Sequence, residues 1–421
     1  MRQLKKRQLF GIVTIAFALT LLMSVDAVRA ADNNELQQII DGASPGDKIV
    51  LEGRSYSGPV LINKPLTLQG QSGSVIASDS GEAAIEVTAD EVVIEHLTII
   101  TDDYGIKLRG ADRGTISHNV IRWSGAKQDE TSHSMESNGI DLYDSHDNRI
   151  ENNEISNMKD AIYIENSHRS IVEGNRLFHS RYGIHCMYTD ATKVINNYGE
   201  FNITGAMVMG VHDVLVSGNT FSKQSENANS QGILLFDVLT SQIEDNVVEG
   251  NRVGIYMELS YENTLRNNAV LRNFIGIQFL ESTDNDFTNN EFISNVIEAE
   301  ALNSTGNRMD SNYWDAVQGL DTNDDGHSDL TYAINPFYQQ VTKKQAAFQL
   351  FFQSPSMNFL SNLYTDNQEQ WSHDASPLMN LPQIDPQNEE HAPKSGWSVA
   401  LLSLLLLGAA TTTIYMGVRK S

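Results

Sequence analysis

The chain has few of the residues that several common classes of protein require. Cys186 is its single cysteine among 421 residues, so no disulfide can form within the chain. Basic residues are also scarce, with 29 Lys and Arg against 54 Asp and Glu and a formal net charge of −25. Because proteins bind nucleic acids by neutralising phosphates with basic side chains, this balance argues against nucleic-acid binding. It permits the binding of cations or of basic partners.

Stretches long enough for a ten-residue helix are missing between the turn residues of the central region. Gly or Ala recurs every 22 residues from Gly139 to Gly205, and again from Gly232 to Gly276 after five extra residues. An asparagine follows each of these positions by 14 residues: Asn153, Asn175, Asn197, Asn219, Asn246, Asn268 and Asn290. A fixed period of this size is typical of stacked repeats. It predicts an all-β fold, a right-handed single-stranded parallel β-helix with coils of about 22 residues.

The repeats define the organisation of the mature chain. We expect the β-helix domain to cover residues 31–310, with Asn34–Gly42 as a helix that caps the first coil. The polar insertion 124–138 predicts a surface loop, and the extra residues at 222–231 predict a second one. The asparagine series predicts a turn that tolerates left-handed backbone and stacks identical amides.

Both ends of the chain carry apolar segments outside the repeats. Residues 1–30 begin with basic side chains and continue with an apolar run and a small-residue cleavage site, which predicts a secretory signal peptide rather than a retained anchor. Residues 397–416 are apolar and uncharged, and Arg419 and Lys420 follow them. We therefore predict a transmembrane helix over 396–418, with a periplasmic domain anchored to the cytoplasmic membrane.

Side-chain alternation along the strands predicts a cluster of soft metal ligands within Gly183–Gly210. Cys186 should point into the core as an inert thiol, while its neighbours point outward on adjacent coils about 4.8 Å apart. The outward set comprises His185, Met187, Met207 and Met209. Since thioether and imidazole groups suit Cu(I), this set predicts a transient Cu(I) site. The alternative is an apolar docking patch that continues through Leu234 and Phe236.

Two further groups of polar residues could bind metals. One is a series at a repeat turn, which could instead be solvated or stacked: His146, His168, Asp190 and His212. The other is an acidic loop within residues 311–335, a predicted capping loop that could bind Ca²⁺ through Asp321, Asn323, Asp325 and Asp329. Tyr332 stands where an EF-hand has its bidentate Glu, so this loop is not an EF-hand and a solvated turn is the alternative.

An enzyme is the rival interpretation of a β-helix. Polysaccharide hydrolases need paired carboxylates on one face. The outward acids Asp141, Glu165 and Glu258 are scattered through the repeats and form no stacked pair with a nearby histidine. A polysaccharide-binding, lyase or hydrolase protein therefore stays an alternative that the fold alone does not establish.

Three stretches resemble the NosD family of nitrous oxide reductase maturation proteins. They are GIHCMY with GAMVMG, NYWDAVQGLDTNDDGHSDLTY, and LFFQSP followed by SPLMNLPQ. The resemblance implies a non-catalytic role in copper-centre assembly of nitrous oxide reductase. It implies as partners the ABC transporter ATPase NosF, its permease NosY and the copper lipoprotein NosL. A metal-free scaffold that couples transporter and reductase remains a further alternative.

The resemblance also implies a role for residues 336–395 as a docking tail and linker. The tail with LFFQSP and SPLMN would reach the permease, and the partner-binding residues expected there are Phe351, Phe352 and Pro355. Leu234 and Phe236 would serve the same purpose on the repeats.

Overall fold

A computed structural model describes most of the mature chain. The described residues are 35–125, 137–224, 227, 230–351, 354–366, 368 and 371–381. The predicted signal peptide 1–30, the predicted span 396–418 and most of the insertion 124–138 lie outside them. Within the described ranges, no helix is both long and apolar enough to cross a bilayer.

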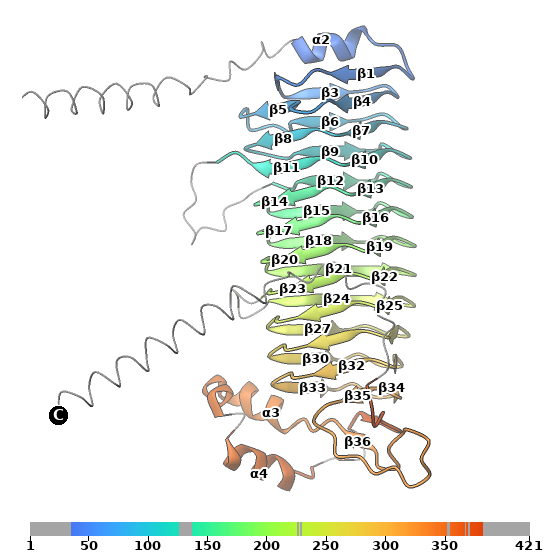
Figure 1. Cartoon of the computed structure of the whole chain (residues 1–421), viewed down its shortest axis with the longest axis vertical. Helices are drawn as coiled ribbons and strands as arrows, with labels where there is room; N and C mark the ends of the chain where they lie inside the picture. The colour runs from blue at the N-terminus through green and yellow to red at the C-terminus, as the bar shows by residue number, and fades with distance from the viewer. Residues whose placement is uncertain are drawn as a thin grey trace, which may run out of the picture. The chain divides into compact units, whose positions relative to one another are not determined.

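The described chain winds through three parallel sheets, one strand of each sheet per coil (Figure 1). Sheet 1 has 14 described strands: β1 (Lys48–Leu51), β4 (Thr67–Gly70), β7 (Val93–Glu95), β10 (Thr115–Ser117), β13 (Arg149–Glu151), β16 (Ile171–Glu173), β19 (Lys193–Ile195), β22 (Leu215–Ser217), β25 (Gln242–Glu244), β28 (Thr264–Arg266), β31 (Asp286–Thr288), β34 (Arg308–Asp310), β37 (His373–Asp374) and β36 (Tyr332–Ala333). Sheet 2 has 12: β2 (Ser55–Ser57), β5 (Val75–Ser78), β8 (Thr98–Thr101), β11 (Val120–Trp123), β14 (Glu154–Ser156), β17 (Arg176–Phe178), β20 (Tyr198–Glu200), β23 (Thr220–Ser222), β26 (Val247–Glu249), β29 (Ala269–Leu271), β32 (Glu291–Ile293) and β35 (Tyr313–Trp314).

Sheet 3 carries the outward residues of interest. Its 11 described strands are β3 (Val60–Ile62), β6 (Ile85–Val87), β9 (Ile106–Arg109), β12 (Ile140–Tyr143), β15 (Asp160–Glu165), β18 (Tyr182–Met187), β21 (Thr204–His212), β24 (Gln231–Leu239), β27 (Val253–Glu258), β30 (Ile275–Leu280) and β33 (Ile297–Leu302). Ile162 and Ile184 are Cα partners on neighbouring coils, which is the predicted step of 22 residues. The predicted parallel β-helix is thereby confirmed.

The repeated asparagines form a buried ladder inside one corner of the coils. The Asn175 amide donates to the Asn197 side-chain oxygen at 3.0 Å and to the Ile150 carbonyl at 2.8 Å. The predicted stacking of amides is therefore confirmed. The left-handed backbone, however, lies at the residue before each ladder position, as at Asn196 with φ 56°. Our assignment of that conformation to the repeating asparagine was wrong, because this residue's task is side-chain hydrogen bonding.

The repeating glycines allow adjacent coils to approach closely. A Cβ built on Gly183 would lie 2.5 Å from the Gly205 carbonyl oxygen, and one on Gly205 would lie 2.5 Å from both the Gly232 oxygen and the Phe221 ring. Such distances are far below van der Waals contact. The glycine series therefore reflects the space between coils.

A Gly205→Ala substitution should test this explanation. The added methyl must push apart the backbone of the next coil, so we expect the free energy of unfolding to fall by about 1–3 kcal/mol, as overpacking does in other cores. Urea denaturation followed by circular dichroism measures it. Gly42→Ala is the control, because its Cβ would meet nothing within 4 Å. Equal stability of the two variants would contradict the explanation.

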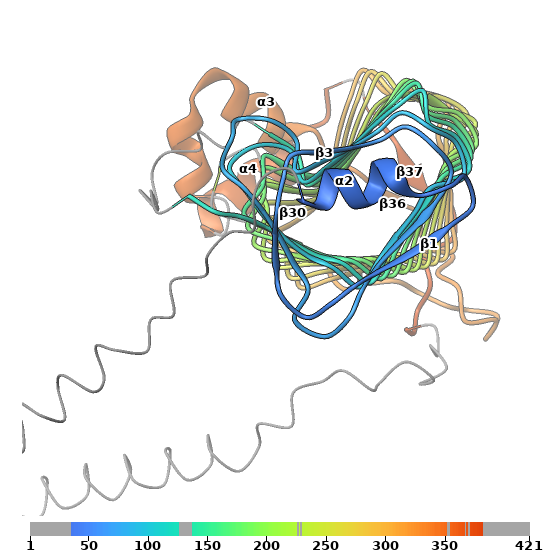
Figure 2. The ribbon, with the colours of Figure 1, turned by 90° about the horizontal axis from the view of Figure 1, so that it is seen from above.

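Both ends of the core are covered. Helix α2 (Glu35–Gly42) buries Leu36 and Ile40 against the first coils, as predicted, and Figure 2 shows it lying across the end of the stack. At the other end Asp374 accepts hydrogen bonds from the Asn312 amide at 2.9 Å and the Trp314 indole at 3.0 Å. Asp374 thus ends the asparagine ladder, although it lies in the segment that we had predicted as tail.

A helical extension precedes this closing segment. It consists of α3 (Phe337–Lys344), the 3₁₀ helix η1 (Ala346–Phe351) and α4 (Pro355–Leu363). Tyr338 of α3 packs on the outer face of sheet 3, against a cluster formed by Val253, Ile275 and Ile297. The lower coils of sheet 3 are thus partly covered.

Candidate functional site

The four predicted copper ligands lie together on the outer face of sheet 3. His185 is the Cα partner of Met207, and Met187 is the Cα partner of Met209, on the adjacent strands β18 and β21. The predicted placement of all four residues on one face is confirmed. Whether they bind a metal is a separate question that depends on the donor atoms.

His185 has the environment of a prepared metal ligand. Its side chain is only 7% exposed, and its Nδ1 lies 3.0 Å from an Asp160 carboxylate oxygen. A carboxylate accepts, so Nδ1 carries the proton and Nε2 has the free lone pair. That Nε2 atom is buried and has no hydrogen-bond partner. Metal-bound histidines usually donate their other ring N–H to a carboxylate in this way, so the residues present fit a copper ion.

Asp160 is itself held by Arg181. The guanidinium donates two hydrogen bonds to the carboxylate, at 2.8 and 2.7 Å. Burial raises the pKa of Asp160, but the hydrogen bonds from His185 and Arg181 outweigh it, and the net result is a pKa below the ordinary value. The carboxylate therefore stays ionised and continues to orient the imidazole.

Two tyrosines flank the imidazole of His185. The rings of Tyr163 and Tyr182 each lie 4.9 Å from it in edge-on geometry. Tyr163 donates a hydrogen bond of 2.7 Å to Glu165, and burial followed by that bond raises its pKa well above the usual range. Both rings limit rotation of the imidazole, so its orientation does not depend on the Asp160 contact alone.

The three methionines and their neighbours form a half-buried apolar patch. Met207 pairs in register with Leu234, and Met209 pairs with Phe236, on β21 and β24. We call Met187, Met207, Met209, Leu234 and Phe236 the methionine patch. The sulfur atoms there suit Cu(I), and the two apolar residues extend the patch as a landing surface would. Both predicted uses of the patch therefore remain open.

Cys186 lies on the other side of the same strand. Its side chain is fully buried, and burial raises the pKa of its thiol to about 12. The prediction of an inward, inert thiol is confirmed for its placement. Since a thiolate is the metal-binding form, this residue does not join the outward donors.

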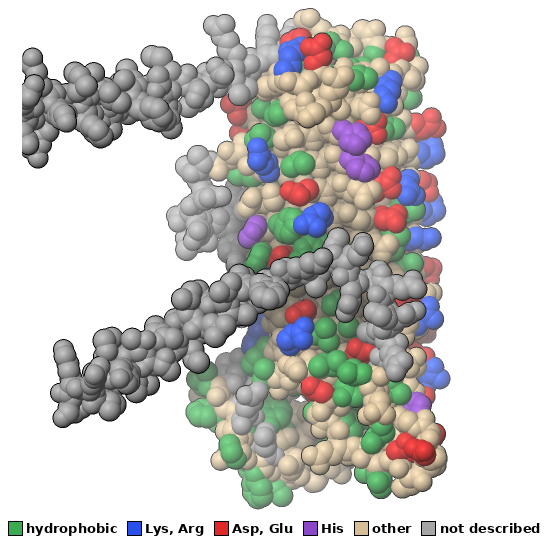
Figure 3. Space-filling view, viewed as in Figure 1, with side chains coloured by type: hydrophobic (Ala, Val, Ile, Leu, Met, Phe, Trp, Pro, Cys, Tyr) green, Lys and Arg blue, Asp and Glu red, His purple; other side chains and the backbone are tan. Residues whose placement is uncertain are grey.

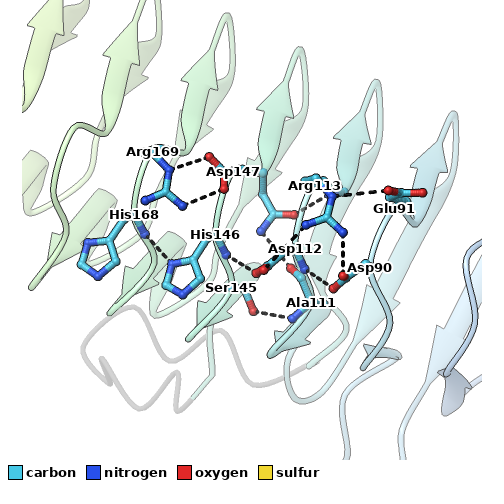
Figure 4. Close-up of polar contacts among 12 residues, drawn as sticks. Asp90, Glu91, Ala111, Asp112, Arg113, Ser145, His146, Asp147, His168 and Arg169 are labelled. Carbon is cyan, nitrogen blue, oxygen red and sulfur yellow. Dashed lines mark hydrogen bonds and ion pairs between the residues drawn. The ribbon is translucent and has the colours of Figure 1, made fainter.

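The second predicted series has a structural role at the turn between sheet 3 and sheet 1. His146 Nδ1 accepts the backbone N–H of His168 at 3.1 Å, and His168 Nδ1 accepts that of Asp190 at 3.0 Å (Figure 4). The two imidazoles stack at 5.1 Å. Next to them Arg169 and Asp147 form a bidentate ion pair. Nδ1 is engaged in backbone bonding at both histidines, and His212 contacts Asp190 at 3.2 Å, so the stacked alternative is supported.

The acidic loop uses its carboxylates for its own backbone. Asp321 accepts N–H groups of Asp324 at 2.7 Å and Gly326 at 2.9 Å, and these bonds lower the pKa of Asp321. Asp325 accepts from His327, and the Thr322 N–H donates to Asp329. In the described ranges, no three His, Cys, Asp or Glu side chains gather as a metal site. The Ca²⁺ site, including Asn323, stays a prediction.

The outward acids are engaged with neighbouring side chains. Asp141 forms an ion pair with Arg109 at 2.6 Å, Glu165 accepts from Tyr163, and Glu258 accepts from Tyr256 at 2.7 Å. Each carboxylate therefore has a structural partner. None of these contacts brings two of the three acids together.

Asp160 and Arg181 are the residues that sequence reasoning missed. Asp160 occupies the outward position before the Gly/Ala series and is the Cα partner of Tyr182. A search of that position would have found an acid one coil from a histidine. Of the predicted tail residues, Phe351 is exposed and Pro355 is exposed at the start of α4, whereas Phe352 lies outside the described residues.

Comparison with known proteins gives a family and a fold. The model of a family described as periplasmic copper-binding protein (NosD) matches residues 122–339, more than half of the chain. No curated protein matches the chain. The mannuronan C-5 epimerase A-modules AlgE4 and AlgE6 of Azotobacter vinelandii are each 14% identical, with TM-scores of 0.54 and 0.56. The aligned regions cover 68% and 70% of this chain and 90% and 94% of the modules.

A phage protein is similar in the same way. Tailspike protein 3 of bacteriophage CBA120 is 12% identical with a TM-score of 0.50, over 68% of this chain and 56% of the tailspike. At such identities the likeness shows the β-helix alone, since one fold hosts many activities.

Proposed function

The chain belongs to the NosD family of periplasmic copper-binding proteins, and from this premise we propose that it is a non-catalytic copper chaperone. It binds Cu(I) transiently at the imidazole of His185 and the thioethers of Met187, Met207 and Met209. It then delivers the ion for assembly of the copper centre of nitrous oxide reductase.

The observation that carries this proposal is the free Nε2 of His185. A buried imidazole nitrogen without a partner is costly unless a ligand uses it. Here the nitrogen lies beside Met207 in the strand register, with two more thioethers on the next outward positions. Two to four soft donors on one face are what Cu(I) binding needs.

The proposed partners follow the family resemblance. We propose that the copper lipoprotein NosL loads the methionine patch, with Leu234 and Phe236 as its landing surface. The ATPase NosF and permease NosY would act with the protein, which a C-terminal helix would tether to the membrane. The metal-free scaffold and the polysaccharide-acting protein are the rival functions.

Anaerobic Cu(I) titration of the purified protein against a chromophoric chelator tests the proposal. We expect one tightly bound Cu(I) per chain. No binding would favour the scaffold, with the methionine patch as a partner's landing surface. An unsaturated product from uronate polymers would instead favour the lyase.

Asp160 should act as a positioning residue for His185. In an Asp160→Ala variant we expect about 10–100-fold weaker Cu(I) binding, the usual loss when a ligand's outer partner is removed. Histidine ¹⁵N NMR of the copper-free protein should show His185 protonated at Nδ1 in the wild type and mixed between Nδ1 and Nε2 in the variant. Glu165→Gln is the matched control, because Glu165 bonds Tyr163 and not His185. An unchanged tautomer and affinity in Asp160→Ala would refute the role.

A further inference from the structure

The helical extension presents a strongly apolar face to the outside. Leu350 is 85% exposed and Phe359 is 63% exposed, and the other members are also exposed. The face consists of Phe348, Leu350 and Phe351 of η1 with Phe359, Leu360 and Leu363 of α4. Figure 3 shows hydrophobic side chains gathered in the region where Figure 1 places α3 and α4. We call these six residues the apolar extension face.

The extension is held on the solenoid from its opposite side. On α4, Met357 and Ser361 are buried, and the Asn335 amide donates to the Ser361 carbonyl at 2.8 Å. The Tyr364 hydroxyl donates to Gln340 of α3 at 2.8 Å. Since Tyr338 of α3 packs on sheet 3, these contacts orient α4 with Phe359 and Leu363 away from the coils.

The charge pattern indicates what covers this face. Residues 345–365 contain no Asp, Glu, Lys or Arg over 21 positions, in a chain with a net charge of −25. Protein interfaces usually surround an apolar centre with a polar, often charged rim. An uncharged run of Phe and Leu fits the boundary between headgroups and acyl chains of a bilayer, where such faces insert by about 5–10 Å.

The length of the following chain places a bilayer within reach. Fifteen residues separate Leu381, which ends the described segment, from the predicted span at 396. Fully extended, they cover at most roughly 50 Å. We infer that the apolar extension face inserts into the outer leaflet surface of the cytoplasmic membrane, as a second lipid contact beside the predicted span. This inference does not depend on copper.

A depth-sensitive fluorescence experiment on the full chain tests the inference. Leu350→Cys carries a bimane label, and Cys186 stays unlabelled because it is buried. Protein is mixed with phosphatidylcholine vesicles that contain lipid with a nitroxide on its acyl chain, and bound chains are collected by flotation. We expect the Leu350→Cys label to lose most of its fluorescence per bound chain. Leu61→Cys, an exposed position near the first coils, should keep its fluorescence.

Two results would overturn the inference. One is a label at position 350 that stays bright in vesicle-bound protein, or a chain that does not float at all. The other is quenching or protection that appears only when the permease is also present, which would assign the face to a protein partner. A Phe359→Ser, Leu363→Ser variant should restore the fluorescence of the Leu350→Cys label, since both residues belong to the inserted face.

Discussion

A Met187→Leu, Met209→Leu double variant is expected to bind Cu(I) at least about 100-fold more weakly than the wild type, because it loses two ligands where a single outer partner is worth about 10–100-fold. Leucine has nearly the volume of methionine, so shape and polarity of the methionine patch change little. Loss of affinity can therefore be attributed to the sulfur atoms. Competition with a chromophoric chelator under anaerobic conditions measures the two dissociation constants.

The control separates a copper site from a landing surface. Leu234→Ala removes apolar area next to Met207 in the strand register and removes no donor atom. Its Cu(I) affinity should equal that of the wild type. If the double methionine variant keeps wild-type affinity, these residues are not the copper site. If Leu234→Ala alone weakens transfer from the copper lipoprotein, the patch also serves docking.

Replacing Asn197 by Ala should destabilise the β-helix more than any surface change. Its side-chain oxygen accepts from the Asn175 backbone and side chain, and its amide donates to the Val172 carbonyl and the Asn219 side chain. Alanine leaves several of these buried groups unpaired. At about 1–3 kcal/mol for each unsatisfied group, we expect the free energy of unfolding to fall by roughly 3–5 kcal/mol.

Urea denaturation of the wild type and the variant gives this difference. Lys193→Ala on the same coil is a suitable comparison, because Lys193 is exposed and exposed substitutions usually change stability by less than about 0.5 kcal/mol. Similar losses in Asn197→Ala and Lys193→Ala would show that the asparagine ladder contributes little. A ladder that propagates along the stack should also broaden the transition of Asn197→Ala, as coils on either side unfold separately.

Much of the fold could be predicted from the sequence because the repeat is local and regular. A period of 22 residues places identical positions on top of one another, and alternation along a strand decides which side chains face the core. The pairs His185 with Met207 and Met187 with Met209 follow from these two rules, and the structure has the same register. The buried Cys186 follows from them as well.

Other features depended on contacts that no period reveals. Asp160 reaches His185 across one coil because side-chain rotamers, the Arg181 ion pair and two tyrosine rings bring the groups together. Asp374 closes the asparagine ladder from 60 residues beyond Trp314, in a segment without any repeat.

The sequence by itself thus determined the coil, its inward and outward faces and the donors that share a face. The tertiary structure alone decided how His185 is oriented, how the open end is closed and which apolar side chains of the extension stay uncovered. The physical reason is that strand spacing and alternation are properties of the local backbone. Hydrogen-bond partners and covered faces instead depend on which non-repeating segments pack together, and several packings share the same local pattern.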